Sequence, residues 1–100
     1  MMPISFLPEA AEEMIEAALY YQSQAFGLGM DYLSEVDHAV HSIETSPHTW
    51  PIIHGDLRRR LIRRFPYGVL YRIEPEEILI VAIAHLRKKP EYWKKRIEKD

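Results

Sequence analysis

Basic side chains that could bind phosphate form two clusters, both in the second half of this 100-residue chain. An arginine guanidinium can pair with a phosphate through two parallel hydrogen bonds, and aromatic rings among the clusters could stack on bases. The clusters and rings are Arg58, Arg59, Arg60, Arg63 and Arg64; Arg87, Lys88, Lys89, Lys94, Lys95, Arg96 and Lys99; and Tyr67, Tyr71, Tyr92 and Trp93. The pattern predicts a surface for a polyanion such as nucleic acid. A charged sheet edge or a surface for an acidic protein would also fit it.

Within this set we expect the residues that contact a substrate to be Arg58, Arg59, Arg64, Tyr67, Lys88, Trp93 and Arg96. A histidine among the arginines adds possible acid–base chemistry. His85 ends an apolar run, and Arg87 follows two residues later. A His or Tyr that moves protons, beside arginines that stabilise a phosphorane, would suit phosphodiester cleavage. A single histidine at a strand end can instead only bond a backbone carbonyl, so both roles stay open.

The formal charge is divided unequally along the chain. Residues 1–50 contain no Lys or Arg and carry a charge of −8, whereas residues 51–100 contain all 13 basic residues and carry +6. The two halves could simply neutralise each other within one fold. Because every basic residue falls in one half, we favour a basic surface for a polyanion.

A metal site is not expected. The chain has no cysteine, which excludes thiolate ligands and disulfide bridges. His38 and His41 are three residues apart, near Asp37 and Glu44, but a zinc site needs three or four converging ligands. A solvated helix face explains this pattern better, and no cofactor motif is present.

Two helices are predicted in the first half of the chain. Residues 4–7 form a short strand, and Pro8 suits the first turn of a helix that runs to about Phe26. After the break at residues 27–29, apolar residues at helical spacing predict a second helix that ends before Ser46. A break this short predicts an antiparallel helical hairpin.

The second half has the two-residue period of strands. Strands are predicted at residues 57–64, 67–73 and 78–84, and a short helix after Pro90. The fold class is therefore α+β, with the hairpin on one face of a mainly antiparallel sheet and the arginine-rich side chains on the other. The predicted core is Phe6, Met14, Ala18, Tyr21, Leu33, Val36, Val40, Ile43, Leu61, Val69, Tyr71, Ile80 and Ala82.

The chain is expected to be one domain, residues 1–100. No apolar run approaches the roughly 20 residues that span a bilayer, and no signal peptide is apparent. We therefore expect a cytoplasmic protein without a membrane partner.

The element order and four local segments resemble the RelE/ParE superfamily of toxins from type II toxin–antitoxin systems, also called plasmid stabilisation proteins. The segments are residues 13–21, 46–51, 63–71 and 82–93. The resemblance covers nearly the whole chain and implies a cognate antitoxin as partner. It also implies one of two activities. RelE-like members cleave mRNA on the ribosome without a metal, and ParE-like members inhibit DNA gyrase.

The resemblance also implies functional residues. Arg59 and Arg63 match basic residues on the second strand of the nucleases, and Arg87 matches an arginine after the last strand. Tyr92 or Trp93 stands where a catalytic tyrosine is found. The catalytic set implied for a metal-independent endoribonuclease is Arg63, His85, Arg87 and Tyr92.

One position departs from the nuclease pattern. Gly68 stands where RelE-like nucleases have an arginine after the tyrosine that begins the third strand. The departure removes a charge expected to stabilise the transition state. It favours a ParE-like gyrase inhibitor. A non-toxic nucleic-acid-binding module is a further alternative.

Overall fold

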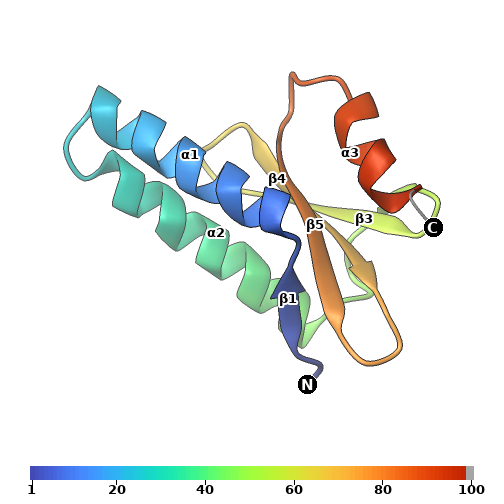
Figure 1. Ribbon diagram of the computed structural model, residues 1–100. Coiled ribbons are helices and arrows are strands. Elements are labelled where there is room, and N and C mark those ends of the chain that lie inside the picture. The colour runs from blue at the N-terminus through green and yellow to red at the C-terminus, as the bar shows by residue number, and fades with distance from the viewer. Residues whose placement is uncertain (99–100) are drawn as a thin grey trace.

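The computed structural model describes residues 1–98 and shows two helices, a five-stranded sheet and a third, short helix (Figure 1). The elements are β1 (Ile4–Phe6), α1 (Pro8–Gln24), α2 (Leu28–Thr45), β2 (Ile52–His54), β3 (Leu57–Leu61), β4 (Tyr67–Ile73), β5 (Ile78–His85) and α3 (Glu91–Ile97). The sheet order is β1-β5-β4-β3-β2. Only the β1–β5 pair is parallel, which confirms the predicted mainly antiparallel α+β fold. Lys99, a member of the second basic cluster, lies outside the described residues.

Two glycines make the tight turn of the helical hairpin. Gly27 precedes α2 with φ +84°, a left-handed conformation that side chains disfavour. Gly29 packs against α1, where a Cβ atom would lie 2.5 Å from the carbonyl oxygen of Ala18. Its backbone N–H also donates to the side-chain oxygen of Gln22. The predicted break at residues 27–29 therefore lets α1 and α2 lie close together and antiparallel.

The strand β5 is apolar on both faces, as its uninterrupted apolar run predicts. A bulge places Val81 opposite no residue of β4, because Leu70 pairs with Ala82 and Tyr71 pairs with Ile80. The side chains of β5 alternate between two apolar clusters, and the bulge places Val81 and Ala82 in the same one. One lies under the hairpin and the other lies under α3.

The hairpin and α3 cover opposite faces of the sheet (Figure 1). Under the hairpin, α2 residues such as Val36 and Ile43 pack on Val69 and Tyr71 of β4. A ring cluster at the same face joins the bend before β4 to the helices, and its members are Tyr21, Tyr32, Phe65 and Tyr67. Under α3, Trp93 is 7% exposed and covers Leu70 and Ala84.

The structure corrects the predicted end of the first long strand. The strand β3 ends at Leu61, so Arg63 and Arg64 lie in the bend that leads to β4. Arg64 has φ +70° and lies within 3.6 Å of Asp31 at the start of α2. The sequence pattern missed β2, a three-residue edge strand. Leu61 was also placed wrongly in the core, because its position near the end of β3 leaves it 48% exposed.

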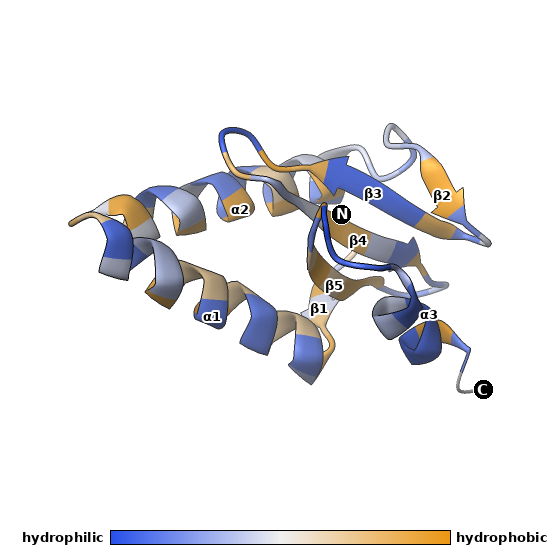
Figure 2. Cartoon of the chain, turned by 90° about the horizontal axis from the view of Figure 1, so that it is seen from above, coloured by the Kyte–Doolittle hydropathy of each residue, from blue (hydrophilic) through white to orange (hydrophobic). Residues whose placement is uncertain are grey.

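The expectation that the arginines share the open face is also wrong. Arg60 points toward the hairpin and its Nε donates to Ser42 of α2 at 3.1 Å. Its guanidinium lies 4.6 Å from the Trp50 ring. Strand alternation leaves Arg59 on the α3 side. Figure 2 shows β3 as a mostly hydrophilic strand, whereas β5, on the other side of β4, is hydrophobic.

The rest of the predicted core is confirmed. Its other members are buried or pack half-buried against the hairpin cluster or the α3 cluster. None of the helices within residues 1–98 has the length and hydropathy needed to cross a bilayer.

Candidate functional site

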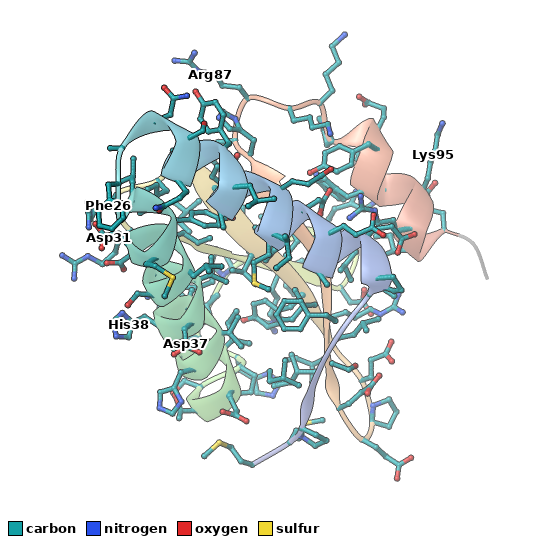
Figure 3. The ribbon with its side chains drawn as sticks, turned by 60° about the vertical axis from the view of Figure 1, so that its left-hand side comes forward. Phe26, Asp31, Asp37, His38, Arg87 and Lys95 are labelled. Carbon is teal, nitrogen blue, oxygen red and sulfur yellow. The ribbon has the colours of Figure 1, made fainter. Side chains whose placement is uncertain are left out.

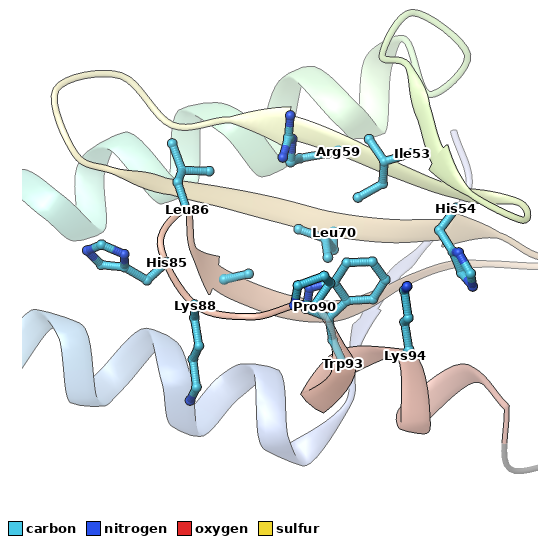
Figure 4. Close-up of a pocket in the computed structure, with 11 residues that line it drawn as sticks. Ile53, His54, Arg59, Leu70, His85, Leu86, Lys88, Pro90, Trp93 and Lys94 are labelled. Carbon is cyan, nitrogen blue, oxygen red and sulfur yellow. The ribbon is translucent and has the colours of Figure 1, made fainter.

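A groove of about 310 Å³ lies on the α3 side of the sheet, between β3–β5 and α3 (Figure 4). Leu70, Ala84 and Trp93 contribute apolar surface to it. Its basic lining residues are His54, Arg59, His85, Lys88 and Lys94. No Asp or Glu lines the groove within the described part of the chain. The groove is therefore the place where anionic groups of another molecule would be attracted most directly.

The basic residues of this groove come from four elements. Arg59 projects from the middle of β3, and His54 projects from β2 at the sheet edge. Lys94 follows Trp93 on α3, while His85 ends β5. Figure 4 shows Lys88 directed out of the groove toward α1. Its Nζ lies 4.3 Å from the centre of the Tyr92 ring.

His85 makes a local hydrogen bond that limits its acid–base chemistry. Its Nδ1 accepts the backbone N–H of Arg87 at 3.0 Å, and its ring packs edge-on against Tyr67 at 5.0 Å between centroids. An accepting Nδ1 is unprotonated, so the neutral ring carries its proton on Nε2. In this arrangement His85 can donate a hydrogen bond from Nε2 but has no free lone pair to remove a proton.

Tyr92 lies outside the groove, in a neighbouring cleft of about 280 Å³ between α1 and α3. Burial, together with the nearby carboxylate of Glu13, raises the pKa of Tyr92 to about 12, and Arg96 opposes the rise. A phenol with this pKa is protonated at neutral pH. Tyr92 can thus donate a hydrogen bond but is a poor general base.

Arg96 is engaged in an ion pair that ties α3 to the rest of the molecule. Its Nη1 and Nη2 donate to the two carboxylate oxygens of Glu13 in α1 at 3.0 and 2.8 Å. Nη1 also donates to the carbonyl oxygen of Val81 in β5. The hydrogen bond to Glu13 raises the pKa of Arg96, mainly by stabilising the cation. Its contacts are those of a structural clamp.

Comparison with known proteins identifies the family. The family model described as the ParE toxin of the type II toxin–antitoxin system parDE matches residues 4–90. The chain belongs to the ParE toxin family. This confirms the predicted RelE/ParE resemblance and the role as a type II toxin, which implies an antitoxin partner. The comparison with curated proteins gave no match.

A solved structure has the same fold as this ParE-family chain. It is titled as the chromosomal ParDE toxin–antitoxin system from P. aeruginosa, and the TM-score is 0.64 at 18% sequence identity. The superposition covers 87% of this chain and 98% of that chain. The fold likeness includes the order of strands and helices that positions the groove.

The other predicted site residues of this ParE-family chain are dispersed. Arg58 holds the segment before β2, because its Nη1 donates to the carbonyl oxygens of His48 and Trp50 at 3.2 and 2.7 Å. Arg63 is exposed in the bend after β3. Arg87 is exposed after β5 and points into solvent (Figure 3).

The structure thus brings together only part of the predicted site. Of the predicted residues, it places Arg59, His85, Lys88 and Trp93 at the groove. It also places His85 and Lys88 at the neighbouring cleft, together with Tyr67 and Tyr92. Trp93 is too buried to offer a free ring face for a base. The catalytic and substrate-binding roles of the predicted residues stay predictions.

Two groove residues, His54 and Lys94, were not among the predicted site residues. His54 lies on the strand that the sequence pattern missed. Lys94 was one of seven basic residues in its cluster. The sequence could not single it out, because the side of α3 that faces the groove is known only once Trp93 is placed in the core.

The histidines of α2 stay apart from this site. His38 and His41 lie near Glu35 and Glu44, at 4.0 and 3.7 Å. Among residues 1–98, no group of three potential metal ligands converges.

Proposed function

We propose that this ParE-family toxin inhibits DNA gyrase by binding without chemistry, and that the groove on the α3 side is part of its binding surface. The observation that carries the proposal is the combination found there. The groove gathers basic residues from four elements with no lining carboxylate, and the candidate proton-transfer groups beside it are not arranged for catalysis.

The argument against proton transfer rests on two residues. Nδ1 of His85 already accepts a backbone hydrogen bond. Tyr92 has a pKa near 12 and lines the neighbouring cleft, to which His85 also contributes. A general base needs a free lone pair within reach of the substrate and a pKa near the working pH. Neither residue has both in this structure, whereas a binding surface needs neither.

A second candidate is a metal-independent, ribosome-dependent mRNA endoribonuclease. Arg59 and His85 line one groove, which favours this activity because fixed arginines stabilise a pentavalent phosphate. His85 would then act as a donor from Nε2. Gly68 weighs against it, since the arginine of the nuclease pattern is missing there.

We infer that the antitoxin neutralises the toxin by covering the basic surface. A partly disordered segment of mixed charge could fold over it and add a helix or strand. Since both proposed targets are cytoplasmic, we also propose that the toxin acts in the cytoplasm.

A brief induction of the toxin with two readouts tests the proposal. We expect blocked supercoiling of a reporter plasmid, with mRNA 5′ ends unchanged. Codon-phased mRNA cleavage with normal supercoiling would contradict gyrase inhibition and support the endoribonuclease. A catalytic role for the groove would further require that Arg59→Ala and His85→Ala abolish the cleavage.

A further inference from the structure

A glycine lies beneath the side chain of the groove's arginine. Gly68 of β4 pairs with Leu61 of β3 on one side and with Ala84 of β5 on the other. A Cβ atom on Gly68 would lie 2.9 Å from Cγ of Arg59 and 3.0 Å from its Cδ. Carbon atoms do not approach this closely without displacement. The arginine stem therefore occupies the space that any side chain at position 68 would need.

This contact follows from strand register. Arg59 pairs with Leu70, so Gly68 is its diagonal neighbour on the same face of the β3–β4 pair. The stem crosses β4 at Gly68, and on β5 the adjacent residue is Ala84, another small residue that lines the groove. Gly68 and Ala84, two small residues in adjacent strands, thus leave a flat surface on which a long side chain can pack.

Packing of the aliphatic part of Arg59 on this surface preorganises its guanidinium for binding. A free arginine loses rotamer entropy when it is fixed in a complex, and a side chain already fixed loses less. Arg59 also forms no hydrogen bond or ion pair with another side chain within residues 1–98, so its donors remain available. Arg58 and Arg60, its neighbours in β3, donate to protein groups instead.

We propose that Gly68 is a positioning residue that holds Arg59 for a phosphate of a nucleic-acid backbone. The proposal goes beyond the proposed function, because it gives the groove a nucleic-acid contact in addition to the contact with gyrase. A phosphate is favoured because the basic residues extend along the groove from His85 to His54 (Figure 4) and no carboxylate lines it. The groove has no exposed Phe, Tyr or Trp ring for stacking, which predicts binding without base preference.

A double-mutant cycle tests the proposal with a labelled 12-nucleotide single-stranded DNA as the probe. We expect Gly68→Ala and Arg59→Ala each to weaken binding about tenfold, the size of one charged hydrogen-bonded contact. In the Arg59→Ala background, Gly68→Ala should cost nothing more, because the displaced stem is already gone. Each variant should also make the slope of log K against log salt less negative by about 0.7, because one phosphate contact is lost.

Controls separate positioning from general damage. Leu61→Ala removes an exposed side chain on the same face that does not line the groove, and it should bind the probe like the wild type. Wild-type affinity in Gly68→Ala, or losses that add in the double variant, would overturn the proposal. So would tight binding of a 12-residue polyglutamate with none of the DNA, because the ligand class would then be an acidic peptide.

A measurement on the wild-type protein covers the case in which Gly68→Ala does not fold. The heteronuclear NOE of the Arg59 Nε–H should be close to backbone values, while that of exposed Arg63 should be low. Equal low values would contradict a held Arg59. If the probe binds as expected but the wild type leaves gyrase active, the proposed function fails and the role of Gly68 stands.

Discussion

The two faces of the sheet are covered by helices of very different length. One face lies under α1 and α2, with 17 and 18 residues, and the other lies under α3, with seven. The long helices bury their face almost completely, and the ring of Tyr32 at that face is 0% exposed. The short helix leaves a groove beside Trp93. Stability and binding are therefore assigned to opposite faces of one sheet.

The same contrast occurs within β3. Arg58 and Arg60 face the hairpin side and donate to groups of the protein itself. Arg59, between them, lines the groove, where we propose that it binds another molecule. The alternation of the strand therefore decides which face each of these three arginines occupies.

The largest expected difference between the faces is in global stability. Ile43→Ala opens a cavity under the hairpin and should lower the free energy of unfolding by about 2–5 kcal/mol in a urea titration. Trp93→Ala should lower it less, because α3 is a short terminal helix that can detach locally. Hydrogen exchange should then show loss of protection in α3 only. Equal losses for the two variants would contradict the division.

The attachment of α3 gives the next effect. Arg96→Met removes the charged hydrogen bonds to Glu13 and should cost about 1.5–3 kcal/mol, seen as a lower Tm. Lys95→Met is the matched control on the same helix. It makes the same change in charge at a side chain that points into solvent (Figure 3) and should leave the Tm nearly unchanged. A similar loss from both would show that net charge, not the clamp, stabilises α3.

Alkaline pH should destabilise both faces through their tyrosines. Burial raises the pKa of Tyr71 and of Tyr92 to about 12, from an ordinary value near 10. Between these values the unfolded chain loses protons that the folded chain keeps. The stabilisation is complete below pH 10 and is lost as the pH rises toward 12, by about 1.4 kcal/mol per pH unit for each tyrosine.

Urea titrations at pH 9, 10 and 11 measure this dependence. Tyr92→Phe should reduce the slope and leave the contribution of Tyr71, on the hairpin side, in place. A stability independent of pH over this range would contradict burial of these phenols.

The smallest effect separates neighbouring arginines. Arg58→Ala should lower stability by about 1 kcal/mol, because it removes the donor to the carbonyl oxygens of His48 and Trp50. Arg59→Ala should change stability by less than about 0.5 kcal/mol, since it has no such partner. Chemical denaturation of both variants checks the pair, and the reverse order would contradict the assignment of their faces.

The fold could be predicted from the sequence where one period dominates a segment. The hairpin has a clear helical period, β4 has a clear two-residue period, and β5 is an uninterrupted apolar run; the structure confirms all of them. β2 could not be predicted, because three residues at a sheet edge hold too little pattern. The end of β3 was predicted too late, because the basic residues continue past Leu61 to Arg63 and Arg64. The composition does not change there, but the backbone bends, with Arg64 at φ +70°.

The candidate site was harder to predict than the fold. The sequence shows that Arg58, Arg59 and Arg60 are basic, but the face of each depends on strand register, which only pairing with β4 fixes. The ion pair between Arg96 and Glu13 could not be predicted, because the two residues are 83 positions apart in the chain. The contact between Gly68 and Arg59 is likewise a property of register.

Inhibition of gyrase supercoiling by purified wild type, Arg59→Ala and Tyr92→Phe tests the central claim most directly. If the groove acts by binding, Tyr92→Phe should inhibit like the wild type, since the ring and its packing remain. Arg59→Ala should need about tenfold more protein, corresponding to one lost charged contact. Full inhibition by Arg59→Ala, or toxicity that depends on the Tyr92 hydroxyl and accompanies mRNA cleavage, would contradict the account.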